Sequence, residues 1–268
     1  MRARQTETSI GDLDKPRILC LHGAGASAEV FSLQMSGLKL DLRASFRLVF
    51  VNGILQSEVH PDLKPVYAGL GPTYTWMHAW ADQNASSPHL DQPTIDRIRQ
   101  QLVTAMKADE GWGEWMGLLG FSQGAWLAFS ILLEDQRRRD RKDGLPAFVE
   151  VCWKFGVIFA CPGEPLALSD LNSHYQVPRC PNDETSEHGE SGRNRTGGRP
   201  ILTMPTIHVC GLEDELLESH RSVVNQWCAP ASWIMMQFDG GHRLPYRPAD
   251  LHPLAADIIR VATANSNL

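Results

Sequence analysis

Three polar residues stand just beyond three apolar runs of the chain and could act together. They are Ser122, Asp214 and His242, which follow the runs 116–121, 206–211 and 232–238, respectively. A serine hydroxyl is a poor nucleophile near neutral pH unless a histidine takes its proton and a carboxylate orients that histidine. The residue types and their order therefore predict a nucleophile, an acid and a base for acyl transfer.

The serine lies in the pattern G-x-S-x-G, between Gly120 and Gly124. The apolar run before it is typical of a strand, and the sequence after it, AWLAFSILL, is typical of a buried helix. In a nucleophile elbow, a sharp strand-to-helix turn holds the hydroxyl above the sheet edge, and the tight bend needs the two glycines. The alternative is that Ser122 only caps the helix.

Several residues compete for the acid and base roles. Glu213, Asp214 and Glu215 all follow the same run, and their positions alone do not separate them well, although we favour Asp214. Asp239 lies next to the histidine strand, where a capping or turn role fits better. Among the histidines we favour His242, because the others that lie in apolar runs, His22 and His208, are typical of packed core histidines.

Acyl transfer also needs two N–H donors for the developing oxyanion. One donor is expected to be the backbone amide of Gln123, the residue after the nucleophile. We place the second at Ala24 in the early loop LHGAGAS, with Gly25 as the alternative. A dinucleotide-binding interpretation of this loop is disfavoured, since Ala28 stands where the third glycine of G-x-G-x-x-G would fall.

These residues need a scaffold that brings distant loops to one edge. Six short apolar runs, rich in β-branched residues, alternate with segments of helical spacing, which favours a doubly wound, mostly parallel α/β sheet with helices on both faces. The expected strands are 17–23, 46–53, 116–121, 155–161, 206–211 and 232–238. The expected helices are 94–109 with Thr94 as N-cap, 122–134, and about 249–264.

Two long irregular segments, about 54–92 and 163–200, interrupt this alternation within a single domain of residues 1–268. Both follow expected strands, which places them at the edge where the strands end and ligands bind. The second is polar near its end, and we expect it to be mobile without ligand. The basic run 137–142 follows a helix and is expected at the opposite end as a solvated connecting loop.

Aromatic residues of the first segment could line an acyl pocket, or simply pack a long loop; they are Tyr74, Trp76 and Trp80.

Composition excludes several classes of function. The net charge of -6 offers no broad basic face for nucleic acid. We find no apolar run of about 18 residues for a membrane span and no signal peptide at the amino terminus. The six cysteines show no regular spacing, so we expect buried thiols in a cytoplasmic protein. The histidines lack metal-binding spacing, and we expect no metal and no organic cofactor.

The assembled motifs resemble the FSH family of serine hydrolases, which have the α/β-hydrolase fold. The resemblance covers nearly the whole chain and rests on PRILCLHGAG, LGPTYTW, LLGFSQGAWLA, HVCGLEDELL and DGGHRLP. In this family the acid lies three residues after the glycine of G-x-x-D, which here is Asp214. The long stretch 172–200 and the run 137–142 depart from shorter members.

The LHGAG opening and the YTWMHAW segment are similar to a fungal branch encoded beside polyketide synthases. That resemblance implies a thioesterase that releases a polyketide chain from the synthase's acyl carrier domain, or removes stalled chains. The alternatives are a general carboxylesterase on small esters and, from another class, a non-catalytic binding module on a hydrolase scaffold.

Overall fold

The central element of the protein is a parallel sheet of six strands in the order β2-β1-β5-β6-β7-β8. The computed structural model describes residues 10–78, 90–141, 148–149, 151–168 and 201–264. The strands are β1 (Arg17–Leu21), β2 (Arg47–Val51), β5 (Trp115–Phe121), β6 (Phe155–Phe159), β7 (Thr206–Gly211) and β8 (Trp233–Phe238). Each lies in a run named from the sequence or extends it by one residue, which confirms the six expected strands and the α/β class.

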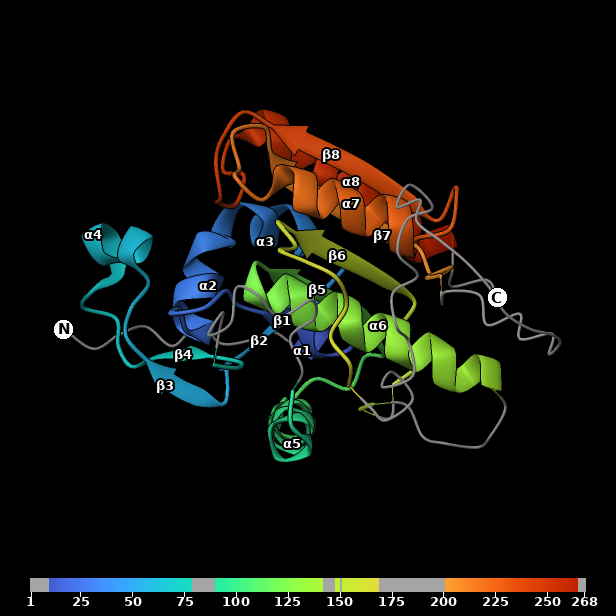
Figure 1. Ribbon diagram of the computed structural model, residues 1–268, viewed down its shortest axis with the longest axis horizontal. Coiled ribbons are helices and arrows are strands. Elements are labelled where there is room, and N and C mark those ends of the chain that lie inside the picture. The colour runs from blue at the N-terminus through green and yellow to red at the C-terminus, as the bar shows by residue number, and fades with distance from the viewer. Residues whose placement is uncertain (1–9, 79–89, 142–147, 150, 169–200, 265–268) are drawn as a thin grey trace, which may run out of the picture.

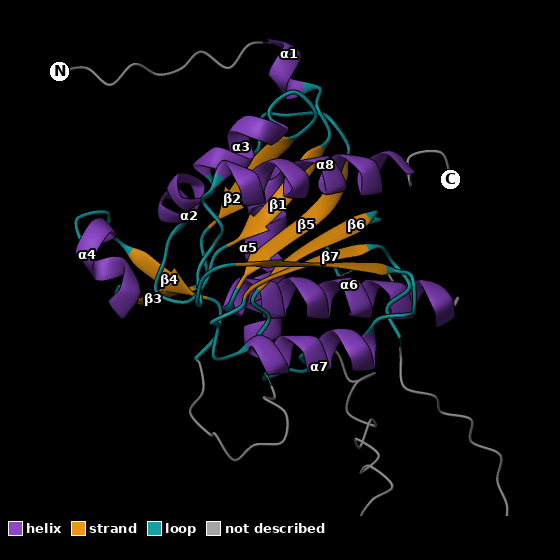
Figure 2. Cartoon of the chain, turned by 90° about the horizontal axis from the view of Figure 1, so that it is seen from above, coloured by secondary structure: helices purple, strands orange, loops and turns teal. Residues whose placement is uncertain are grey.

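Helices cover both faces of this sheet, as Figure 2 shows from above. One face carries α2 (Ala28–Gln34), α3 (Ser36–Leu42) and α8 (Pro248–Ala264), and the other carries α5 (Gln92–Ala108), α6 (Gln123–Arg141) and α7 (Leu217–Trp227). A short helix, α1 (Ile10–Leu13), precedes β1. The strands β1, β5, β6 and β7 are buried almost along their whole length, because apolar side chains of both faces pack beneath helices.

Segment 54–78 forms a small structure of its own beside the sheet. It contains a two-stranded antiparallel pair, β3 (Leu55–Ser57) and β4 (Thr73–Thr75), joined through the 3-10 helix η1 (Pro61–Leu63) and α4 (Lys64–Tyr67). Figure 1 places it on the side toward which β6 and β8 point. The expectation of an irregular segment is therefore wrong for these residues, because they form a strand pair and two short helices. A bridge between Ala26 and Tyr74 anchors the pair to the loop after β1.

Two boundaries differ from the sequence-based expectation. Helix α5 starts two residues early, because the Asp91 side chain accepts a hydrogen bond from the Thr94 amide at 3.1 Å and caps the helix in place of Thr94. Residues 137–141 belong to helix α6 and not to a loop. Arg138 Nε donates to the buried Glu134 carboxylate at 2.7 Å, an i,i+4 pair that extends the helix.

Segment 163–200 falls largely outside the described residues, which end at 168 and resume at 201. The expectation that it is mobile is therefore a prediction only.

Candidate active site

Ser122 occupies the turn between β5 and α6 with a backbone φ of 52°, in the left-handed region that few non-glycine residues adopt. Its neighbours explain why this turn requires glycine. A Cβ on Gly120 would lie 2.2 Å from the Gly124 carbonyl oxygen, and one on Gly124 would lie 2.1 Å from the Leu21 oxygen. The Ser122 amide donates to the Phe159 carbonyl at 2.9 Å, which ties the turn to β6. The bend thus holds one hydroxyl at the end of the sheet.

The side chains of Ser122, His242 and Asp214 form a continuous hydrogen-bonded chain. His242 Nε2 lies 2.9 Å from Ser122 Oγ, and His242 Nδ1 lies 2.9 Å from Asp214 Oδ2. Because the carboxylate can only accept, Nδ1 carries the proton and Nε2 is free to accept one from the serine. The structure therefore brings together three residues that the sequence places in separate loops.

The loops after β7 and β8 hold the acid and the histidine against each other. A Cβ on Gly211 would lie 2.1 Å from the Gly240 carbonyl oxygen, so only glycine allows the two loops to approach this closely. The Glu213 amide donates to the same Gly240 oxygen at 2.9 Å. His242 follows two residues later, and its side chain is 23% exposed, so solvent and ligands can reach it.

Asp214 is buried but stays easily ionised. Burial raises its pKa, but hydrogen bonds from His242 and from the Leu216 amide at 2.9 Å outweigh that effect and hold the pKa below its ordinary value. The other carboxylates considered for the acid role have different surroundings. Glu213 and Glu215 are exposed, and Asp239 pairs with Arg247 at 2.9 Å.

The two candidate oxyanion donors come from the start of α6 and from the loop after β1. The Gln123 amide is in the first turn of α6, where a helix offers its N–H groups no internal partner. The Gly25 amide donates to the Tyr74 carbonyl at 2.9 Å, whereas the Ala24 amide has no hydrogen-bond partner within the described residues. The loop after β1 also lies close to the nucleophile, since a Cβ on Gly23 would be 3.4 Å from the Ser122 Cβ.

The Gln123 side chain has a structural task that the sequence analysis missed. It is buried, and its Oε1 accepts from the Trp76 amide at 2.8 Å and from the Thr75 hydroxyl, while its Nε2 donates to the Met77 carbonyl at 3.3 Å. These bonds fix residues 75–77 directly to the nucleophile turn. Its position after the serine pointed to the amide alone, and no local pattern pointed to the distant partners of the side chain.

The aromatic residues that were expected to line an acyl pocket differ in their surroundings. Trp76 is fully buried, and its Nε1 donates to the His22 carbonyl at 2.9 Å, so it packs in the core and offers no surface to a substrate. That burial corrects the expectation for Trp76 in favour of loop packing. Tyr74 is half-buried on β4, beside the loop after β1. Trp80 lies outside the described residues.

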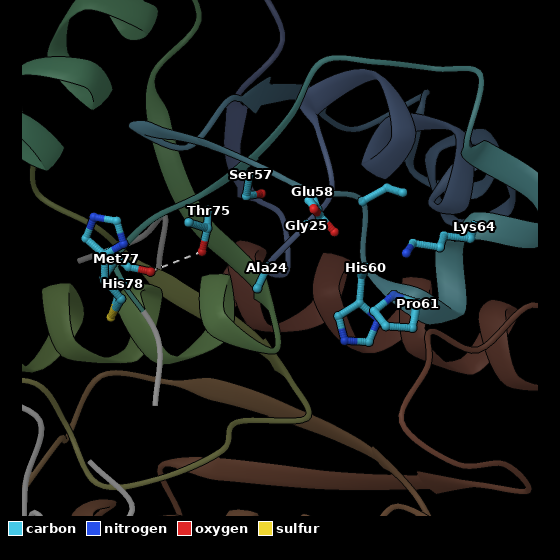
Figure 3. A pocket seen from close by; sticks show the side chains of 11 residues that line it. Ala24, Gly25, Ser57, Glu58, His60, Pro61, Lys64, Thr75, Met77 and His78 are labelled. Carbon is cyan, nitrogen blue, oxygen red and sulfur yellow. Dashed lines mark hydrogen bonds between the residues drawn. The ribbon is translucent and has the colours of Figure 1, made fainter. Parts of the chain in front are cut away.

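A hollow of about 320 Å³ opens beside Ala24, between the loop after β1 and segment 57–78 (Figure 3). Its lining includes charged and polar side chains, among them Glu58, His60 and Lys64.

The remaining histidines in apolar runs are packed as expected. His22 and His208 are both fully buried. His22 Nδ1 donates to the Gly23 carbonyl at 2.7 Å, and its Nε2 accepts from the Gly53 amide at 2.9 Å. Among the described residues, no group of three histidine, cysteine or acidic side chains could hold a metal ion.

Comparison with known proteins supplies the family. A family model described as serine hydrolase (FSH1) matches residues 12–253. The chain belongs to this family. A relative described as a probable esterase of Aspergillus terreus is 35% identical over 257 residues, covering 92% of this chain and 89% of the relative. Esterase citA of Monascus ruber is 32% identical over 263 residues, with 97% of both chains covered.

The relatives named here are described as esterases, and the protein is accordingly a serine hydrolase of the esterase class. Solved structures agree on the α/β-hydrolase fold. Arabidopsis thaliana SOBER1 aligns with a TM-score of 0.52 at 16% identity, covering 92% of this chain and 99% of SOBER1. A carboxylesterase from Mesorhizobium loti gives 0.52 at 14% identity, covering 93% and 90%. Within the described residues, no helix is long and apolar enough to cross a membrane.

Proposed function

We propose that the protein hydrolyses an acyl thioester or ester through Ser122, His242 and Asp214. Ser122 Oγ attacks the carbonyl carbon while His242 Nε2 takes its proton, and Asp214 stabilises the imidazolium. Collapse of the tetrahedral intermediate breaks the bond to the thiol or alcohol, which leaves with the proton from His242. Water, deprotonated by His242, then attacks the acyl-serine, and the acid and free enzyme are released. No co-reactant other than water is needed.

The amides of Ala24 and Gln123 would bind the oxyanion of both tetrahedral intermediates. The Gln123 amide is favoured by its place at the start of α6, where the helix dipole also stabilises negative charge. The Ala24 amide is favoured over that of Gly25, because it has no partner among the residues that the structure describes, whereas the Gly25 amide is already bonded to Tyr74. Loss of one such donor would raise the barrier by about 3 kcal/mol.

One observation carries the proposal: the hydrogen bonds of 2.9 Å on each side of His242. The test compares Ser122→Ala with Ser36→Ala, an exposed serine at the start of α3. We expect Ser122→Ala to lose hydrolysis of butyryl thioesters and esters, and Ser36→Ala to retain it. Full activity in a folded Ser122→Ala protein would overturn the proposal.

For the natural reaction we propose release of a polyketide chain, or of a stalled acyl chain, from the acyl carrier domain of a synthase. The support is the resemblance of LHGAG and YTWMHAW to a fungal thioesterase branch. The test measures kcat/KM on S-butyryl N-acetylcysteamine and on the same acyl group attached to a carrier domain. A higher value on the carrier-bound thioester supports carrier release; equal values would contradict it.

The second candidate is a carboxylesterase acting on small esters, and the printed names of the relatives, which are esterases, favour it. Matched butyryl substrates separate the two. A kcat/KM for p-nitrophenyl butyrate well above that for the N-acetylcysteamine thioester would identify the carboxylesterase.

A further inference from the structure

The hollow beside Ala24 is lined by several charged and polar side chains. Its walls come from the loop after β1, from segment 57–64 and from residues 75–78. Lys64 supplies a cation, Glu58 a carboxylate, and His60 and His78 two imidazoles. Ala24 lines the same hollow, and its amide is the proposed oxyanion donor. A group bound here would therefore lie near the reacting carbonyl.

The polar wall is held firmly against the loop that carries Ala24. Gly25 has a φ of 69°, and a Cβ there would lie 2.5 Å from the His60 backbone nitrogen, so the two segments touch through backbone alone. The His60 amide donates to the Gly25 carbonyl at 3.0 Å, and the Lys64 amide donates to the His60 carbonyl at 3.2 Å. Lys64 thus stands one turn beyond a residue bonded directly to this loop.

Lys64 has no carboxylate partner within the described residues, although Glu58 lines the same hollow. Figure 3 shows its side chain reaching back toward Glu58 and Gly25. The Asp62 amide donates to His60 Nδ1 at 3.3 Å, and the Asp62 carboxylate lies 3.7 Å from the same nitrogen. That bond leaves the proton of a neutral His60 on Nε2, so the imidazole offers a donor. One unpaired ammonium and one imidazole N–H are the groups that bind a carboxylate or a phosphate.

We propose that this hollow binds an anionic group of the substrate, with Lys64 Nζ as the main partner and His60 Nε2–H as the second. The inference rests on the proposed function, because it places the anion on the compound that Ser122 attacks. The substrate class is then an acyl thioester or ester that carries a carboxylate on its acyl chain or a phosphate on its leaving group. Glu58 opposes the anion and limits how tightly it is held.

Two pairs of substrates distinguish these two sources of charge. For the acyl chain, mono-p-nitrophenyl glutarate is compared with neutral p-nitrophenyl butyrate. For the leaving group, S-butyryl phosphopantetheine is compared with neutral S-butyryl N-acetylcysteamine. The measured quantity is the ratio of kcat/KM for the anionic member to that for the neutral member, in wild type, Lys64→Gln and Glu58→Gln. Lys107→Gln, on the exposed side of α5, is the matched control.

We expect Lys64→Gln to lower the ratio about tenfold in one of the two pairs, the size of one hydrogen bond to a charged group. Glu58→Gln should raise the ratio in the same pair, and Lys107→Gln should not change it. The pair that responds identifies whether the anion is on the acyl chain or on the leaving group. Added salt should lower the wild-type ratio and leave the Lys64→Gln ratio nearly constant.

The proposal is wrong if the Lys64→Gln ratio equals the wild-type ratio in both pairs, or if the two variants move it in the same direction. Hydrolysis of the neutral substrates by wild type, and its loss in Ser122→Ala, tests the proposed function separately. A failure of the anion site therefore leaves a different result from a failure of the nucleophile.

Discussion

Two histidine arrangements in this protein share one residue type and nearly the same hydrogen-bond lengths, but their surroundings differ. In the candidate active site, His242 lies between a serine and a carboxylate, with 2.9 Å on each side. Beneath α7, His208 Nδ1 lies 2.9 Å from His220 Nε2, and His208 Nε2 lies 3.0 Å from the Thr206 hydroxyl. The first arrangement is open to solvent, whereas both histidines of the second are fully buried.

Burial keeps the second arrangement neutral. Desolvation lowers the pKa of His220 to about 4, although the charge of Asp214 opposes that change, and desolvation also lowers the pKa of His208 well below its ordinary value. The pair therefore has no ready way to hold a proton taken from a substrate or nucleophile. His242 differs by a direct hydrogen bond to an ionised carboxylate, which stabilises the imidazolium. A catalytic base therefore needs an anionic partner and an open face, and a histidine alone supplies neither.

The largest effect is expected from breaking the open arrangement at its centre. His242→Ala leaves Ser122 without a base, and we expect kcat on S-butyryl N-acetylcysteamine to fall about a millionfold, as removal of a triad base does elsewhere. The melting temperature should change little, because His242 is at the surface of the site. A folded variant with more than a hundredth of wild-type kcat would contradict the role of His242.

Asp214→Asn tests the anionic partner that the buried pair lacks. The amide keeps the shape of the side chain but can no longer stabilise the imidazolium, so kcat should fall about 10,000-fold. The lowered pKa of Asp214 also implies that its carboxylate stays charged as the pH falls to its ordinary pKa. Glu213→Gln, on the exposed neighbour, is the matched control and should keep wild-type kcat. Equal kcat in the two variants would rule out Asp214.

Asp135 is a second buried carboxyl, and its pKa is shifted in the direction opposite to that of Asp214. It is fully buried in α6, where burial raises its pKa to about 7, although the Phe148 amide donates a hydrogen bond to it. Between about pH 4 and pH 7 the folded chain therefore holds a proton that the unfolded chain releases. The contribution of Asp135 to stability falls as pH rises through this range.

Asp135→Asn should remove this loss, on the order of 3 kcal/mol between pH 4 and pH 8. Urea unfolding at the two pH values measures it, with Asp140→Asn on the exposed part of the same helix as control. A pH dependence in Asp135→Asn as steep as in wild type would refute the raised pKa.

The smallest effect is expected from the buried pair itself. His220→Leu leaves the Cys161 amide and His208 Nδ1 without their partner, and should lower the free energy of unfolding by about 1–3 kcal/mol. The kcat of the folded variant should stay within about threefold of wild type, because the buried pair takes part in no step of the proposed reaction. Chemical unfolding and turnover are measured together, with exposed His252→Leu as control. A large loss of kcat without loss of stability would bring His220 into the mechanism.

The α/β scaffold could be predicted from the sequence because its strands have a clear apolar pattern. Buried parallel strands read as continuous apolar runs, and all six such runs are strands of one sheet. The order of polar residues after those runs was equally informative, since parallel strands end at the same edge. This is why Ser122, Asp214 and His242 could be named before any distance between them was known.

Contacts between distant segments could not be read in the same way. The Gln123 side chain bonds to residues 75–77, and His208 bonds to His220, but neither pair has a spacing that a local pattern would reveal. The role of Trp76 could not be decided from the sequence for the same reason: an aromatic side chain in a long loop is equally suited to a substrate pocket and to the core. In the structure Trp76 is buried in the core, and its Nε1 donates to the His22 carbonyl, far away in the sequence.

Ser122 is the proposed nucleophile of this esterase, and every step of the proposed reaction depends on it. The most direct measurement is reaction with a fluorophosphonate probe, followed by mass spectrometry of the labelled peptide. We predict one phosphonylated residue, Ser122, in wild type, very slow labelling in His242→Ala, and none in Ser122→Ala. Labelling of another residue in wild type, or undiminished labelling of Ser122→Ala, would contradict the claim.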